Sequence, residues 1–215
     1  AHQGEITASY EVREPNLIDL TVTVRARGSY PAYEIFLSNY FDKTLRPYVC
    51  LQPLARGKNS GKPNLVVPMV NDVFRGTVLV FPRDSHAARR CVDGRWDRSE
   101  FASPTVQMCP VRRYDRCLAF AVDAERQLAV VLMSHPRHCY AISARYFAED
   151  EADRLTTYTA FDLSQFGDDL APGDQRTARV RLAVTPVDDQ FSQPLALYRQ
   201  FIEEVEQHPL TQAKP

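Results

Sequence analysis

The sequence predicts an all-β fold, an antiparallel sandwich followed by one amphipathic helix at the C-terminal end. Three observations predict it. Segments of alternating apolar and polar residues recur along most of the chain, turn residues separate them, and the period becomes helical only near the C-terminus. The 215 residues, of which 44% are hydrophobic, are enough to bury the core of one such domain. We therefore expect residues 1–215 to form a single β-sandwich domain.

The first half of the chain contains five segments with the composition of strands. In residues 17–27, apolar residues alternate with polar ones, which is typical of an antiparallel strand with one buried face. Its apolar side consists of Ile18, Leu20, Val22, Val24 and Ala26. Similar segments follow at 33–41, 45–53, 64–70 and 76–82, and Pro68 predicts an edge strand or a bulge in the fourth.

The strand pattern is lost at about 85–110, where charged residues surround an Asp-Gly turn and the single tryptophan, Trp96. We expect an irregular excursion there, because a long connection in a compact domain is usually functional or disordered. Strand-like segments return at 116–123, 126–134, 138–147, 156–163 and 177–187. Pro172 and Gly173 precede the last of them and suit the central positions of a type II turn.

Residues 192–207 have a helical period. One face collects the apolar residues Pro194, Leu197, Tyr198, Phe201, Ile202 and Val205. Ser192 is a candidate N-cap, and a proline is tolerated in the first turn of a helix. We expect this helix to pack against the sandwich.

Composition excludes several classes of function. The net charge of −1 lacks the basic excess that nucleic-acid binding needs, so no nucleic-acid partner is expected. No apolar run approaches the roughly 20 residues of a membrane span, and the sequence leaves open whether this soluble chain is cytoplasmic or exported. The five cysteines lack the spacing of a metal site, and neither a metal nor a cofactor is expected. A bridge between Cys91 and Cys109 is one alternative, and buried free thiols are the other.

Three segments carry a resemblance to a known family: YEIFLSNYF at 33–41, the run from CYAISARYF through TTYTAFDL and the Pro-Gly turn to TARVRLAVTP, and ALYRQFIEE in the helix. Their order resembles the β-supersandwich of galactose-mutarotase-like proteins and of related carbohydrate-associated domains. The resemblance covers about two-thirds of the chain and is one of pattern. It implies a supersandwich fold and a carbohydrate ligand, whereas the two histidines and the glutamate of a mutarotase are not matched position by position.

The strand at 33–41 supplies the candidate ligand-binding residues. The odd positions of this strand are suited to packing on a core. The even positions, together with Asp42 directly after the strand, combine aromatic rings, acids and a hydroxyl. They are Glu34, Phe36, Ser38, Tyr40 and Asp42. Sugar rings stack their apolar faces on aromatic side chains, while their hydroxyls need polar partners, and successive even positions lie about 7 Å apart. The alternative is that a second layer covers this face and that its rings belong to a core.

Two further candidates complete the prediction. His135 and His138 lie three residues apart and are candidate catalytic residues for proton transfer; the alternative is an exposed hairpin turn. Trp96 and Arg95 are candidate ligand-binding residues that would stack on a ligand, or else Trp96 anchors an irregular segment.

The sequence therefore predicts a carbohydrate-binding domain with no demonstrated catalysis. Two alternatives remain: a sugar-active enzyme on the same scaffold, using a histidine with Glu34 or Asp42, and a structural or protein-interaction sandwich. Whether the chain is an enzyme and which oligomeric state it adopts are left open.

Overall fold

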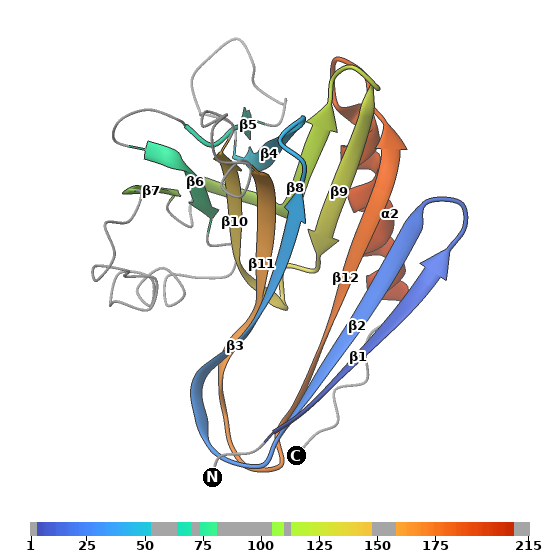
Figure 1. The fold of residues 1–215 in the computed structure, drawn as a ribbon. Helices are drawn as coiled ribbons and strands as arrows, with labels where there is room; N and C mark the ends of the chain where they lie inside the picture. The colour runs from blue at the N-terminus through green and yellow to red at the C-terminus, as the bar shows by residue number, and fades with distance from the viewer. Residues whose placement is uncertain are drawn as a thin grey trace.

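The computed structural model describes residues 4–52, 64–69, 74–80, 105–109, 113–147 and 158–208. These residues form two β-sheets and one helix (Figure 1). Among them, no helix is both long and apolar enough to cross a membrane. The predicted antiparallel sandwich with a C-terminal helix is confirmed.

The larger sheet has seven strands in the order β1-β2-β12-β9-β8-β4-β5, and every neighbouring pair is antiparallel. The bounds of its strands are β1 (Gly4–Arg13), β2 (Leu17–Ala26), β12 (Gln175–Pro186), β9 (Leu128–Ser134), β8 (Tyr114–Asp123), β4 (Leu45–Leu51) and β5 (Asn64–Val66). Strand β5 ends before Pro68 and lies at an edge, as the proline predicts.

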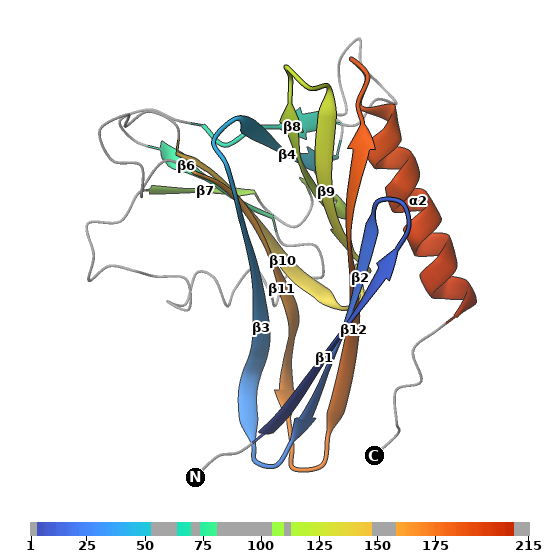
Figure 2. The ribbon, with the colours of Figure 1, turned by 45° about the vertical axis from the view of Figure 1, so that its right-hand side comes forward.

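The smaller sheet has five strands in the order β3-β11-β10-β6-β7. Their bounds are β3 (Tyr30–Phe41), β11 (Tyr158–Leu170), β10 (Cys139–Phe147), β6 (Phe74–Val80) and β7 (Thr105–Cys109). Only the pair β6–β7 is parallel among the strands described. Strands β1 and β3 thus form one edge of each sheet, and at one end of the molecule tight turns join β2 to β3 and β11 to β12 (Figure 2).

The main core lies between the two sheets. Strand β11 contributes Phe161 and Leu163, strand β10 contributes Ile142, and these pack in one cluster with Phe120 and Leu132 of the larger sheet. Because side chains alternate along a strand, the residues between these core positions point away from the larger sheet. We call that side of the five-stranded sheet the outer face.

Helix α2 (Ser192–Gln207) covers the other side of the larger sheet (Figure 2). It buries Pro194, Tyr198, Phe201 and Val205, which confirms the predicted apolar face. The predicted capping role of Ser192 is wrong, because Phe191 occupies the N-cap position and Ser192 is the first helical residue. The hydroxyl and the backbone N–H of Ser192 both donate hydrogen bonds to the carboxylate of Asp188, which lies in the turn before the helix.

The remaining sequence-based expectations fall in turns and loops. Gly173 has a φ of 94°, as the third position of a type II turn requires. Most of the excursion expected at about 85–110 lies outside the described residues, and residues 105–109 form β7. Cys109 is a free, buried thiol, so the bridge to Cys91 is not formed; Cys91 itself lies outside the described residues.

Candidate functional site

The even-numbered residues of the second half of β3, Phe36, Ser38 and Tyr40, lie on the outer face. Strand β3 pairs with β11 in a register that places Phe36 opposite Ser164, Ser38 opposite Asp162 and Tyr40 opposite Ala160. Phe161 and Leu163 point into the core, so their neighbours on β11 point outward together with the paired residues of β3. The pattern read from the sequence therefore describes a real difference between two faces.

Two aromatic rings on this face meet solvent. Phe36 is 39% exposed and Tyr40 is 61% exposed, and Ser38 between them is also exposed. The Tyr40 ring packs edge-on against Tyr158, with 5.2 Å between the ring centroids. An exposed ring held by a second ring offers a flat apolar surface whose orientation is already restricted.

A buried carboxylate lies beside the exposed hydroxyl. Ser38 Oγ donates a hydrogen bond of 2.6 Å to Asp162 Oδ1, and Asp162 is only 1% exposed. Arg145 Nε lies 3.8 Å from Asp162 Oδ2, which is an ion pair but not a hydrogen bond. Burial raises the pKa of Asp162 above its ordinary value, and this effect exceeds the opposing effects of Ser38 and Arg145.

Several polar atoms of this region are not satisfied. Asp162 Oδ2, Arg145 Nε and Ser164 Oγ are buried and make no hydrogen bond within the described part of the chain. Buried polar groups in proteins are usually paired, and each exception needs an explanation. We call Ser38, Arg145, Asp162 and Ser164 the outer-face polar cluster. Only Ser38 of these four residues is among the site residues that the sequence predicts.

The two acids at the ends of the predicted stripe have different surroundings. Glu34 is half-buried and pairs across the sheet with Phe166. Asp42 is exposed, and its Oδ1 accepts a hydrogen bond of 2.9 Å from the backbone N–H of Thr44. This bond lowers the pKa of Asp42 and fixes the turn that leads into β4.

His135 and His138 lie in the turn between β9 and β10, with 5.6 Å between their ring centroids. His135 Nε2 is 4.0 Å from Glu206 Oε1 of α2, so this ring points toward the helix. Burial, followed by the charges of His135 and Arg137, lowers the pKa of His138 to about 4. His135 also has a lowered pKa, mainly through burial, and both rings are therefore neutral near pH 7.

The histidines and Asp42 lie at opposite ends of β11. The His138 carbonyl accepts a hydrogen bond of 2.7 Å from the Phe166 N–H, whereas Phe41 pairs with Thr159. Seven residues of strand separate these two positions, which corresponds to about 23 Å. The structure thus does not bring Asp42 to the histidines, whereas Glu34 lies opposite Phe166, the residue whose N–H bonds the His138 carbonyl.

The other predicted site residues add no further group. Trp96 and Arg95 lie outside the described residues. Among the residues that the structure describes, no group of three or more histidines, cysteines or acids is placed to hold a metal ion.

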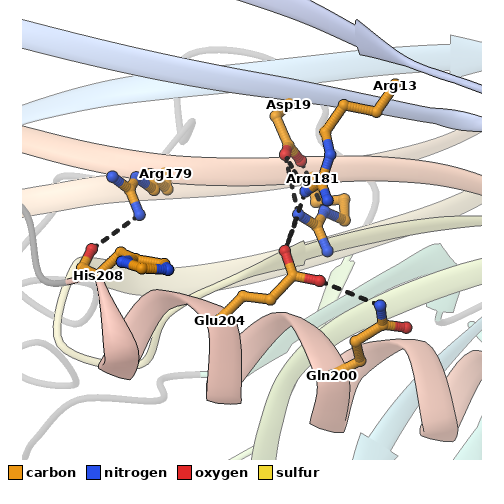
Figure 3. Close-up of polar contacts among 7 residues, drawn as sticks. All are labelled: Arg13, Asp19, Arg179, Arg181, Gln200, Glu204 and His208. Carbon is orange, nitrogen blue, oxygen red and sulfur yellow. Dashed lines mark hydrogen bonds and ion pairs between the residues drawn. The ribbon is translucent and has the colours of Figure 1, made fainter.

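A network of charged residues joins the β1–β2 hairpin to α2 (Figure 3). Arg181 is 3% exposed and donates two hydrogen bonds to Asp19, of 2.6 and 2.8 Å, and one of 2.7 Å to Glu204. Arg13 donates to the same two carboxylates. These bonds lower the pKa of Glu204 to about 2, with Arg181 as the largest cause. Each carboxylate accepts hydrogen bonds from an arginine, so we assign this network a structural role in holding α2 against the sheet.

A cavity of about 180 Å³ lies where the tips of the two sheets meet. Tyr30, Tyr33, Ile6 and Val24 are among the residues that line it. It is smaller than the roughly 300–1,000 Å³ of typical ligand pockets, and its lining is mainly apolar. We assign no function to it.

Comparison with known proteins places the fold in context. No protein-family model matches the sequence, and no curated protein matches it. The solved structures that match include a proposed aldose 1-epimerase of Escherichia coli K12, with 10% sequence identity, a TM-score of 0.48 and 87% of this chain covered. A proposed aldose 1-epimerase of Klebsiella pneumoniae subsp. pneumoniae MGH 78578 matches with 11% identity, a TM-score of 0.45 and 94% of this chain covered.

This chain covers 62% and 51% of the lengths of those two proteins. The sequence predicts a resemblance of fold to mutarotase-like sandwiches, and these matches agree with it, but with TM-scores below 0.5 they carry no argument of their own. Such distant and partial similarity says nothing about activity, so any functional proposal must rest on the residues of this chain.

Proposed function

We propose that this protein binds carbohydrate on the outer face of β3, with Phe36, Ser38 and Tyr40 as the contacting residues. The observation that carries the proposal is a pair of solvent-exposed rings on either side of a hydroxyl that a buried carboxylate holds in place. A pyranose combines apolar C–H faces with hydroxyl groups at its rim. A surface that alternates rings and hydrogen-bonding groups is complementary to both parts.

The spacing of these groups supports the proposal. Phe36, Ser38 and Tyr40 follow one another at every second residue of a strand, about 7 Å apart. A sugar ring resting on Tyr40 therefore has the Ser38 hydroxyl within reach of its edge, and the next unit of an oligosaccharide would extend toward Phe36. Strand β3 lies at the edge of its sheet, so no described strand adjoins one side of this surface.

Asp162 has a positioning role in this proposal. The Ser38 hydroxyl donates its only proton to Asp162, so its oxygen lone pairs are directed away from the carboxylate. Ser38 then presents an acceptor to a sugar hydroxyl. The carboxylate itself is too deeply buried to touch a ligand in this arrangement.

The experiment that tests the proposal is a printed glycan array followed by calorimetric titration with the strongest oligosaccharide. Replacing Tyr40 by alanine is expected to weaken binding about tenfold, the size of effect that loss of one aromatic anchor has at binding sites. Phe36→Ala should weaken binding of longer oligosaccharides more than that of monosaccharides.

The matched control is Tyr10→Ala, which removes another exposed tyrosine, from β1 of the other sheet. It should leave the affinity in solution unchanged. Binding that is unaffected by Tyr40→Ala, or lost equally in Tyr10→Ala, contradicts the proposed site.

Catalysis by the histidines is a second proposal, favoured by the adjacency of the two rings. With a pKa of about 4, His138 is an unprotonated acceptor at neutral pH and would act as a general base on a sugar hydroxyl. Polarimetry of freshly dissolved α-D-galactose, with wild type and with His138→Ala, tests it. A rate of mutarotation equal to the uncatalysed rate in both proteins rejects this proposal and leaves the binding proposal intact.

A further inference from the structure

Strand β1 exposes an apolar stripe that the fold does not cover. Ile6 is 58% exposed, Tyr10 69% and Val12 71%, and Ile18 of β2, which pairs with Val12, is 38% exposed. We call these four residues the β1 stripe. They lie on the same face of the larger sheet as the buried Val22 and Val24, because Ile6 pairs with Val24 and the alternation continues along the strand.

The face that buries Val22 and Val24 is covered by the smaller sheet only in part. Both valines pack with Phe166 and Leu170 of β11, whereas the β1 stripe remains in solvent. Strand β1 is also the edge of its sheet, so none of the described strands pairs with one side of its backbone (Figure 1). An exposed, apolar edge strand of ten residues is a template for pairing with another strand.

We propose that the partner is a second copy of this chain, whose β1 pairs antiparallel with β1 across a two-fold axis at Ser9. The two seven-stranded sheets then become one continuous sheet. A two-fold axis perpendicular to the sheet places the inner faces of both copies on the same side of the joined sheet. Because the even-numbered residues of β1 lie on that face in each copy, even-numbered residues must pair with even-numbered ones.

Charge and size select this register among the neighbouring ones. With the axis at Ser9, Glu5 of one copy lies opposite Arg13 of the other, at both ends of the pair. On the apolar face, Ile6 lies opposite Val12, and the large Tyr10 lies opposite the small Ala8. Opposite charges and complementary side chains are the pairs that stabilise antiparallel strands.

The two alternative registers are poorer. An axis at Ala8 places Glu5 opposite Glu11, a repulsive pair at each end. An axis at Tyr10 places the two Tyr10 rings opposite each other and gives Glu5 no cation of the second copy, so that it keeps only its exposed ion pair of 3.3 Å with Arg27 of its own chain among the described residues. Arg13 already bonds Asp19 and Glu204 through Nη1, but a guanidinium has five donors, and its side chain is 38% exposed.

A cysteine placed on the axis tests both the dimer and its register. Residues directly opposite each other in antiparallel strands have Cα atoms about 4.5–5.5 Å apart, within the range that a disulfide spans. Ser9→Cys, in a background with Cys91→Ser, should form a dimer under mild oxidation that reduction removes. The other native thiols, Cys50, Cys109, Cys117 and Cys139, are buried and should not interfere.

Thr7→Cys in the same background is the matched control. Thr7 is exposed on the same face as Ser9, but the two Thr7 residues would lie four strand positions apart, or about 13 Å. Cross-linking through Ser9→Cys and not through Thr7→Cys supports the proposed register. Equal cross-linking of both variants, or of neither, overturns it.

Sedimentation velocity over a concentration series tests association without any cross-link. The wild type should shift from monomer to dimer with rising concentration, and Val12→Lys should remain monomeric, because the lysine would face an apolar residue of the second copy. A wild type that stays monomeric throughout overturns the proposal. That result would mean that another partner, or another part of a longer protein, covers the β1 stripe.

Discussion

Strands β1 and β3 are the edges of the two sheets, and their exposed faces differ in chemistry. The exposed face of β1 presents the apolar side chains of Ile6 and Val12 and the ring of Tyr10. The exposed face of β3 presents Phe36 and Tyr40 with a hydroxyl between them. An apolar edge is complementary to another apolar surface, whereas an alternating one is complementary to a ligand that is itself both apolar and polar. The same edge position can thus serve two kinds of recognition.

The ionic contacts near these two edge strands differ as well. Behind β1, Asp19 and Glu204 receive hydrogen bonds from Arg181 and Arg13, and the pKa values of both acids are lowered. Near β3, Asp162 accepts a hydrogen bond from Ser38, its Oδ2 has no hydrogen-bond partner among the described residues, and burial raises its pKa. A satisfied network stabilises the fold, while an incompletely satisfied one persists where it has another use.

The largest effect is expected from breaking the satisfied network. Arg181→Met keeps much of the side-chain packing on Phe201 but removes the charge between Asp19 and Glu204. Arg13 still bonds both acids, so we expect a loss of about 2 kcal/mol in the free energy of unfolding rather than the full cost of a buried unpaired charge. Urea denaturation at pH 7 measures it.

Arg179→Met is the control for this substitution. Arg179 lies two residues away on the same face of β12, and its described side-chain hydrogen bond goes only to the His208 carbonyl. Its replacement should cost less than about 1 kcal/mol. Equal losses in the two variants would show that the network contributes nothing beyond removal of a long side chain.

A smaller effect, and one of opposite sign, is expected behind β3. Asp162→Asn keeps an acceptor for the Ser38 hydroxyl and removes a charge that its surroundings disfavour. The free energy of unfolding at pH 7 should therefore stay level or rise by up to about 1 kcal/mol. Carbohydrate affinity should fall, because the amide holds the Ser38 proton less firmly than a carboxylate does.

Denaturation and calorimetric titration of the same Asp162→Asn preparation separate the two roles. If the variant loses both stability and carbohydrate affinity, Asp162 has a structural role and the proposed positioning role is contradicted. Ser164→Ala, which changes a hydroxyl of the same cluster without touching the Ser38–Asp162 bond, serves as the comparison for both measurements.

Local patterns in the sequence predicted much of the architecture. The alternation in 17–27 and 33–41 identified strands with two unlike faces, and the helical period of 192–207 identified the residues of α2 that are buried. Both patterns depend on positions two to four residues apart, which a single sequence displays directly. The exposure of Phe36 and Tyr40 belongs to the same kind of information.

The outer-face polar cluster depends on information that local patterns do not contain. Ser38 and Asp162 are 124 residues apart in the sequence and meet only through the register of β3 and β11. One signal was available: Asp162 stands between Phe161 and Leu163 in a strand that is otherwise rich in apolar residues. A charged residue in such a strand indicates a buried partner, although the sequence does not say which residue it is.

The smallest expected effect is a difference in how the two edges respond to pH. The pKa of Glu204 is lowered from 4.5 to about 2, so its contribution to stability is complete above about pH 5 and is lost as the pH falls toward 2. The stability advantage of wild type over Glu204→Gln should shrink over that range.

The pKa of Asp162 is raised, so its carboxylate destabilises the fold at neutral pH and ceases to do so once it is protonated. Relative to Asp162→Asn, wild type should therefore gain stability as the pH falls. Urea denaturation of the three proteins between pH 7 and pH 3 measures both trends, and two trends of the same sign would refute the contrast between the two ionic contacts.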